Sequence, residues 1–313
     1  MDQKNTSNQQ NNVNYLKYTS YASALAGIST KFIIHPLDTL KNKIQIQTQK
    51  SHLKDLKRHL LLQKTKETFK NEGIRGFYKG VGISSLGSVP AFSLFMTTYE
   101  WTKKKISQDN NILSKNKFVM HMICGFNAEL VSCILWLPID VIKERLQVQQ
   151  NIKLYNYKNS INAAYVIIQK EGILGLYTGF GATLVSFGTS IALHFAFYEK
   201  LKEFFCENPD KISFSQSSLL AGLAGIISST LSNPFSISKL RIQVQQIESK
   251  NSFRYKNIFH GVYLIHTQEG FLAHFKGLSA KILTNTPQKS ISISITEYFR
   301  QILLNNQYKN IQN

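Results

Sequence analysis

The sequence of 313 residues predicts an all-α membrane protein with six transmembrane helices in three pseudo-threefold repeats, each with a short surface helix. Three observations support this. A ten-residue motif that begins with proline occurs three times, at 36–45, 138–147 and 234–243. Three long runs carry no charge but many Gly, Ser and Thr residues. A charged segment separates the two expected helices of each repeat.

Each copy of the motif has proline first, lysine sixth, a second base eighth and glutamine tenth. The third position is Asp38 in the first copy, Asp140 in the second and Ser236 in the third. Chance does not place so many chemical features in one register three times, so we expect one unit repeated three times. The prolines, lysines and glutamines are Pro36, Pro138, Pro234, Lys41, Lys143, Lys239, Gln45, Gln147 and Gln243.

The formal charge of +19 fits either a nucleic-acid binder or a protein among anionic lipids. The bases are spread through the repeats without a basic tail, zinc-finger spacing or RNA-binding aromatic motif, which argues against nucleic acid. The charge-free runs 81–99, 173–198 and 212–238 can each span about 30 Å of hydrocarbon as helix. The cysteines form no CxxC pair, and no metal cluster or catalytic triad appears, so we expect no enzyme.

The elements follow in the same order in each repeat. We expect odd-numbered helices with a kink at the motif proline at about 15–49, 117–150 and 213–247. Surface helices are expected at 53–71, 157–170 and 256–268, the second with Ile161, Tyr165 and Ile168 on one face. Even-numbered helices run to about 106, 205 and 304. The repeats are placed at 15–110, 111–208 and 209–305, between a disordered tail at 1–14 and a tail at 306–313.

The charge distribution predicts the topology. The long segments 41–79, 143–178 and 239–276 hold 22 Lys and Arg, and the short connections 100–117 and 199–211 hold 8. Because basic segments favour the more negative compartment, we expect the long segments there and both termini on the other side.

A second motif recurs on the even-numbered helices, with an acid and a base three residues apart. Its residues are Glu100, Lys103, Glu199, Lys202, Glu297 and Arg300. Together the motifs suggest one ring of ion pairs at each end of a central cavity, which alternating access requires. The alternative at the first motif is a pair within one helix, such as Asp38 with Lys41, and spacing alone does not separate the two.

With these motifs, the chain resembles the mitochondrial carrier family over about residues 15–305. The resemblance implies exchange of a small metabolite or cofactor across the inner mitochondrial membrane, both termini toward the intermembrane space, and no cofactor. It implies a matrix gate of Asp38–Lys143 and Asp140–Lys239 braced by the glutamines, and open where Ser236 faces Lys41. The implied cytoplasmic gate pairs are Glu100–Lys202, Glu199–Arg300 and Glu297–Lys103.

The resemblance also implies that cardiolipin binds at helix N-termini, whose free N–H groups suit phosphate. The matching residues are Gly73, Lys79, Gly80, Gly172, Gly179, Gly270, Lys276 and Gly277. Thr178 replaces the usual base in the second site, and simple helix caps are the alternative.

The substrate contacts implied by the resemblance are Gly87, Ser88, Ser186, Phe187, Thr284 and Asn285. None is charged, which weakens the case for a dicarboxylate or phosphate substrate that arginine would bind. Lys31, Glu129, His194 and Lys289 are further polar candidates, each with packing or a local pair as the alternative.

Two functions remain open from the sequence. The first is a solute carrier whose partners are a small-molecule substrate, cardiolipin and inner-membrane lipids. The second is a transport-inactive subunit of a larger inner-membrane assembly, favoured by Ser236, Thr178 and Thr296, which depart from the repeated motifs.

Overall fold

The computed structural model describes residues 28–47, 59–108, 117–152, 156–205, 214–245 and 254–285. Within these ranges the ordered elements are helical and no strand occurs, so the all-α prediction is confirmed for this part of the chain. The expectations for both tails, the orientation of the termini, Lys289, Glu297 and Arg300 lie outside the described residues.

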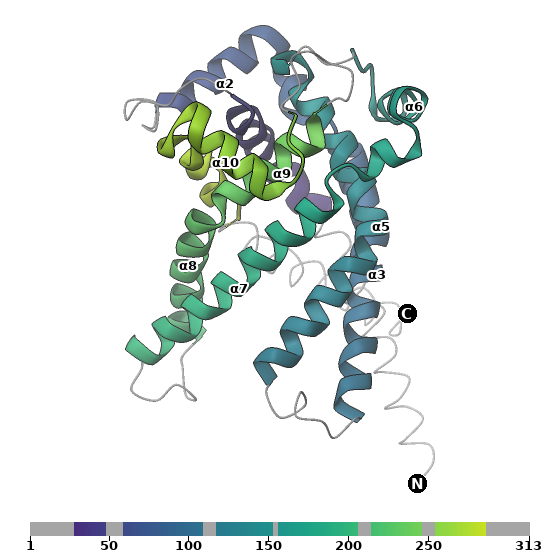
Figure 1. Cartoon of the computed structure of the whole chain (residues 1–313). Helices are drawn as coiled ribbons and strands as arrows, with labels where there is room; N and C mark the ends of the chain where they lie inside the picture. The colour runs from purple at the N-terminus through teal and green to yellow at the C-terminus, as the bar shows by residue number, and fades with distance from the viewer. Residues whose placement is uncertain are drawn as a thin grey trace, which may run out of the picture.

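The same order of elements occurs in each repeat. The first contains a helix at 28–45, α2 (His59–Glu72), the short 3-10 helix η1 (Ile74–Tyr78) and α3 (Val81–Gln108). The second contains α5 (Lys117–Ile152), α6 (Ser160–Glu171), η2 (Ile173–Tyr177) and α7 (Phe180–Phe205). The third contains α8 (Phe214–Leu231), α9 (Asn233–Val244), α10 (Ile258–Glu269), η3 (Phe271–Phe275) and a helix at 278–285. Helices α2, α6 and α10 lie at the same end of the molecule (Figure 1).

Three helical spans of the described chain are long and apolar enough to cross a membrane: Ile74–Ser107, Met122–Gln150 and Ile173–Phe205. The predicted charge-free runs 81–99 and 173–198 lie inside the first and third of these spans. The run 212–238 is divided between α8 and α9, and only the shorter apolar helix Leu219–Leu231 falls in it. Three of the six predicted membrane spans are therefore found by length and composition, and the other three remain predictions.

The motif prolines interrupt their helices unequally. A single helix with a kink was expected at 213–247, but the chain forms α8 and α9 with Ser232 between them. Pro234 lies in the first turn of α9, where a missing backbone N–H costs no hydrogen bond. Pro138 lies inside the unbroken α5, and the Ile134 carbonyl that it leaves unbonded accepts a hydrogen bond from the Tyr177 hydroxyl at 3.1 Å.

Apolar residues join the repeats beside the motifs. Ile46, Val148 and Val244 each follow the motif glutamine, and they form one buried cluster with Leu240. A second cluster packs α5 against α6 through Leu137, Val141 and Ile167. The apolar face predicted for α6 points outward, with Ile161 83%, Tyr165 63% and Ile168 44% exposed. An exposed apolar face on a surface helix suits the interfacial region of a membrane.

Two glycines at positive φ flank each 3-10 helix, for example Gly172 at 73° and Gly179 at 84°. Glycine adopts this left-handed conformation without steric cost. The second glycine of each pair also lies against the motif of the next repeat. A Cβ on Gly179 would lie 2.9 Å from Gln243 Cγ, and one on Gly277 would lie 2.9 Å from Gln45 Cγ. These glycines therefore permit close contact between repeats, whether or not lipid binds nearby.

We predict that Gly179→Ala destabilises the protein by about 1–3 kcal/mol, because it combines a strained φ with a close contact to Gln243. Thermal unfolding of the purified protein in detergent measures the effect. Gly181→Ala is the matched control, since nothing lies within 4 Å of its Cβ and its φ is not positive. Equal melting temperatures for the two variants would contradict the role assigned to Gly179.

Candidate functional site

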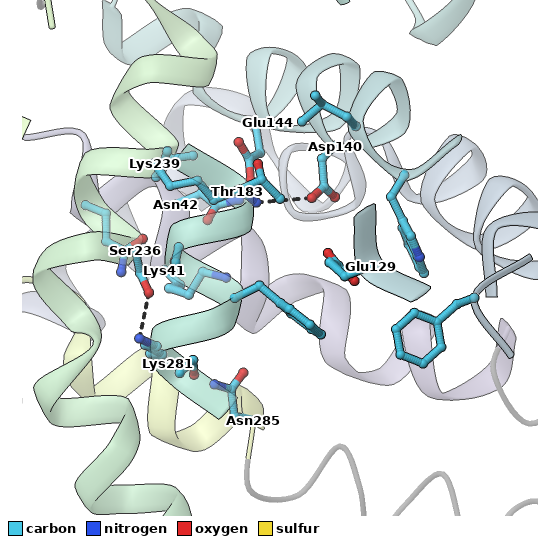
Figure 2. Close-up of a pocket in the computed structure, with 18 of the residues that line it drawn as sticks. Lys41, Asn42, Glu129, Asp140, Glu144, Thr183, Ser236, Lys239, Lys281 and Asn285 are labelled. Atoms are coloured by element: carbon cyan, nitrogen blue, oxygen red, sulfur yellow. Dashed lines mark hydrogen bonds and ion pairs between the residues drawn. The ribbon is translucent and has the colours of Figure 1, made fainter. Parts of the chain in front are cut away.

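A cavity of about 520 Å³ lies between the repeats and is lined by side chains from all three of them. Its charged lining includes Lys41, Glu129, Asp140, Glu144, Lys239 and Lys281. Figure 2 shows Lys41, Ser236 and Lys281 on one side and Asp140 with Glu129 on the other. Aromatic rings of Phe92, Phe95, Trp136 and Phe187 complete much of the lining.

Two ion pairs link the repeats at one end of this cavity. Lys143 Nζ lies 3.0 Å from Asp38 Oδ2, which joins repeats one and two. Lys239 Nζ lies 3.1 Å from Asp140 Oδ2, which joins repeats two and three. The alternative pair within one helix is present as well, because Lys41 Nζ lies 2.6 Å from Asp38 Oδ1. Asp38 therefore binds one lysine of its own repeat and one of the next.

The third link between repeats is chemically different. Ser236 carries no charge, and its Oγ accepts a hydrogen bond from Lys281 Nζ at 2.7 Å. Sequence reasoning missed Lys281, although the repeats offer a signal. It stands four residues after Gly277, where the other repeats place Ser84 after Gly80 and Thr183 after Gly179. Glu144 was missed too; it lines the cavity, 3.7 Å from Lys239 Nζ.

A second layer of ion pairs lies next to the first. The eighth motif residue of each repeat binds the glutamate that ends the surface helix of the same repeat. The pairs are Lys43 with Glu72, Arg145 with Glu171, and Arg241 with Glu269. The partners of these bases were not predicted from the sequence. Their nearly constant separation from the glutamate, 29, 26 and 28 residues, was the available signal.

The two arginines of this layer also reach the next repeat. Arg145 Nε donates to the Gln243 carbonyl at 3.1 Å, and Arg241 Nε donates to the Gln45 carbonyl at 3.0 Å. A guanidinium has five N–H donors in a planar fork, so it can bind a carboxylate and a carbonyl together. Lys43 has a single nitrogen and binds Thr68 in addition to Glu72. Repeat one is therefore tied less firmly to repeat two in this layer.

The motif glutamines cross to the preceding repeat. Gln147 Nε2 donates to Thr39 Oγ1 at 3.0 Å, and Gln243 Nε2 donates to Thr183 Oγ1 at 3.3 Å. Gln45 Nε2 donates to Asn233 Oδ1 at 3.3 Å, which closes the cycle. Among the described residues, no hydrogen bond joins these glutamines to the acid or lysine of an inter-repeat pair. Their predicted bracing of those pairs stays a prediction.

The lysines expected at lipid sites face carboxylates. Lys79 Nζ lies 2.6 Å from Glu72 Oε2, and Lys276 Nζ lies 2.7 Å from Glu269 Oε2. Thr178, at the equivalent place, donates to its own turn, at the Gly175 carbonyl. Lipid binding stays a prediction. The backbone N–H groups beside the flanking glycines would have to provide the contacts to the lipid phosphate.

Three of the six predicted substrate contacts line the cavity: Ser186, Phe187 and Asn285. The other three contact their own helices or a neighbour. A Cβ on Gly87 would meet Ile139 at 2.6 Å, Ser88 donates to the Ser85 carbonyl, and Thr284 donates to the Ala280 carbonyl.

Two further candidates contact aromatic rings. Lys31 Nζ lies 5.8 Å from the centre of the Trp136 ring, within the range of a cation–π contact. The His194 ring makes an edge contact with Phe195.

The opposite end of the cavity lacks such a link in the described residues. Glu100 lies on α3 and Lys202 on α7, and no ion pair joins them in this part of the chain. The ends of α3 and α7 that carry them lie apart in Figure 1. The expected partners of Glu199 and Lys103, which are Arg300 and Glu297, lie outside the described residues.

Comparison with known proteins identifies a family that matches this chain. A family model described as "Mitochondrial carrier protein" matches residues 14–110, 114–209 and 210–307. The chain is 31% identical to "Mitochondrial substrate carrier family protein E" of Dictyostelium discoideum, over 89% of this chain and 93% of the relative. It is 29% identical to the succinate/fumarate mitochondrial transporter of Saccharomyces cerevisiae, over 91% and 90%. Identity to the mitochondrial 2-oxodicarboxylate carrier of Bos taurus is 30%, over 88% and 91%.

We predict that Arg241→Lys lowers the free energy of unfolding by about 1–3 kcal/mol, because lysine cannot bind Glu269 and the two carbonyls of repeat one together. Chemical or thermal unfolding in detergent provides the measurement. Lys200→Arg, at a side chain 79% exposed, is the control and should change stability by less than about 0.5 kcal/mol. An Arg241→Lys protein as stable as this control would show that the carbonyl contacts contribute nothing.

Proposed function

The chain belongs to the mitochondrial carrier family, and from this we propose that it carries a small solute across the inner mitochondrial membrane by alternating access. The observation that carries the proposal is the asymmetry of the cavity. Ion pairs link the repeats at one end, and the corresponding pair of Glu100 with Lys202 is not formed at the other. A cavity whose repeats are linked at one end and, in the described part of the chain, unlinked at the other fits one of the two states that such a cycle requires.

The strength of the inter-repeat pairs suits a gate. Their side chains are 9% and 17% exposed in Lys143–Asp38, and 18% and 23% exposed in Lys239–Asp140. Partly hydrated pairs of this kind contribute roughly 1 kcal/mol each. A bound solute can offset such a loss only through different affinities for the two states. Few and weak links therefore favour a gate that opens and closes over a permanent seal.

The closed end is proposed to face the matrix. It carries α2, α6 and α10, which lie in the basic long segments that charge distribution assigns to the more negative compartment (Figure 1). The open end would then face the intermembrane space, and the structure would represent the conformer that receives solute from that side.

The names of the relatives support transport over the alternative of a structural subunit, since they are named as transporters or carriers. The substrates in those names include succinate and fumarate, 2-oxodicarboxylates and nicotinamide adenine dinucleotide. These compounds form the first panel for this chain. A saturable exchange of one panel member by purified protein in cardiolipin-containing liposomes is the expected result. Stabilisation by cardiolipin without exchange of any panel member would instead support the structural subunit.

Ser236→Asp should favour the conformer with the closed matrix end, because an acid there would meet Lys281 and face Lys41, and so supply the third link. The measurement uses a thiol introduced by Ser190→Cys in a background without native cysteines, since Ser190 lines the cavity. The rate at which this thiol is labelled from the intermembrane-space side reports how often the cavity is open there. Faster labelling is expected with Ser236→Asp.

Ser236→Asn is the matched control, because it has a similar size and no charge. If aspartate and asparagine at position 236 gave the same labelling rate, charge at this position would not bias the conformers.

A further inference from the structure

The third repeat departs from the other two at two neighbouring positions. In the first two repeats, the third motif residue is an acid, and Ser84 or Thr183 occupies the equivalent place on the even-numbered helix. Those hydroxyls bond to their own helix, at the Val81 and Gly179 carbonyls. In the third repeat the acid is replaced by Ser236 and the hydroxyl by Lys281, and these two side chains touch at 2.7 Å. The repeat has lost a negative charge and gained a positive one at the same place.

Lys281 is a buried lysine with neutral partners. Its residue is 6% exposed, and its ammonium donates to Ser236 Oγ at 2.7 Å, Ser232 Oγ at 3.1 Å and the Ser229 carbonyl at 3.2 Å. No carboxylate of the described residues pairs with it, and the other charged side chain on its side of the cavity in Figure 2 is Lys41. Burying a charge is costly without a counter-ion, so an opposite charge would be bound favourably here.

The nearby carboxylates do not meet this need. Asp38 is shared between Lys41 and Lys143, and Asp140 lies within ion-pair distance of Lys143 and Lys239. Glu144 lies beside Lys239 at 3.7 Å and is drawn away from Lys281 in Figure 2. Glu129 also lines the cavity, on the side of Asp140, and it is not paired with Lys281 among the described residues. Lysines outnumber carboxylates here by one, with Lys31, Lys41, Lys143, Lys239 and Lys281 against Asp38, Glu129, Asp140 and Glu144.

We propose that the carboxylate of a small organic acid binds between Lys281, Lys41 and Ser236, and so takes the place of the acid that the third motif lacks. All three side chains line the cavity, and Asn285 lines it one helical turn beyond Lys281 (Figure 2). A carboxylate there would accept from Lys281 and Lys41 in place of one present partner of each, and from the Asn285 amide. The Ser236 hydroxyl, which donates to the Ser232 carbonyl at 3.2 Å, would have to turn to join them. The inference rests on the proposed transport function in one respect: the carboxylate is taken to belong to the transported solute.

A solute carboxylate bound at this place would help to hold this end of the cavity closed. In the other two links, the protein provides both the acid and the lysine. In the third link the solute provides the acid and repeats one and three provide the lysines, so binding joins those repeats. A solute that forms part of the ring interacts differently with the two conformers, which is the condition for driving a conformational change. An uncharged solute of the same size would not supply this link.

Ligand-dependent thermal stability of the full chain, in detergent with cardiolipin at constant ionic strength, tests the site. The probes are succinate and 2-oxoglutarate, with dimethyl succinate as a neutral analogue and sulfate as an inorganic anion. We expect succinate or 2-oxoglutarate to raise the melting temperature and dimethyl succinate to have no effect. Lys281→Thr should weaken the apparent affinity at least about tenfold, since it removes a charged hydrogen-bond donor.

Ser236→Asp is the second variant, because it keeps Lys281 and supplies the acid internally. We expect a higher melting temperature without ligand and a loss of the response to the carboxylates, as the new side chain occupies their place. Lys200→Gln, at an exposed side chain on α7, makes the same charge change as Lys281→Thr and should leave the response intact. An unchanged response in both Lys281→Thr and Ser236→Asp would overturn the site, and sulfate as effective as succinate would overturn its assignment to carboxylates.

Exchange in liposomes separates this inference from the proposed function. Exchange of a carboxylate that neither variant alters, or exchange of uncharged solutes alone, would overturn the site and leave the carrier function standing. A Lys281-dependent stabilisation by carboxylates without exchange of any panel member would support the site and argue against transport. Exchange of a carboxylate that is slowed by Lys281→Thr and unaffected by Lys200→Gln would support both.

Discussion

The structure depends on the pairing of charges buried where the three repeats meet. Each motif brings an acid or a serine, a lysine and a second base into a region where an unpaired charge is costly. The second bases bind glutamates of their own repeat and hold each surface helix against its motif helix. The lysines bind acids of the neighbouring repeat and hold the repeats together. One layer therefore stabilises each unit, and the other makes contacts that can be exchanged.

This division has a structural reason. The arginine pairs are fully enclosed, with Arg145 and Arg241 at 0% side-chain exposure, and breaking one would leave a charge stranded in a dry site. The Lys239–Asp140 pair lines the cavity, and the Lys143–Asp38 pair is partly exposed, so that water or a solute can replace a partner. Opening the cavity at this end is thus expected to break the lysine pairs between repeats and to preserve the arginine–glutamate pairs within repeats two and three. The positive-φ glycines assist, because they let each 3-10 turn lie directly against the motif of the next repeat.

The repeat pattern in the sequence predicted the helical class, the order of elements and the close pairing of motif charges, because periodic spacing and charge reflect local geometry. It did not distinguish the partners: Asp38 binds both Lys41 and Lys143, and only three-dimensional packing decides that. The break at Ser232 was not predicted either, since a proline that kinks one helix can begin another. Lys281 and Glu144 were not predicted because they stand at positions that the repeats do not share. Residues that break the symmetry require the repeats to be compared position by position.

The asymmetry of the third repeat is informative because the other two repeats act as internal references. A random loss of the acid at position 236 would leave Lys41 without its partner from repeat three and would add no cation nearby. Instead a lysine stands opposite the lost acid, buried and hydrogen-bonded to the serine that replaced it. A second cation at a site that has lost its anion raises the electrostatic cost of the empty site and lowers that of the anion-bound one. That combination disfavours a purely structural role for the third link and favours one in which a negatively charged ligand completes it.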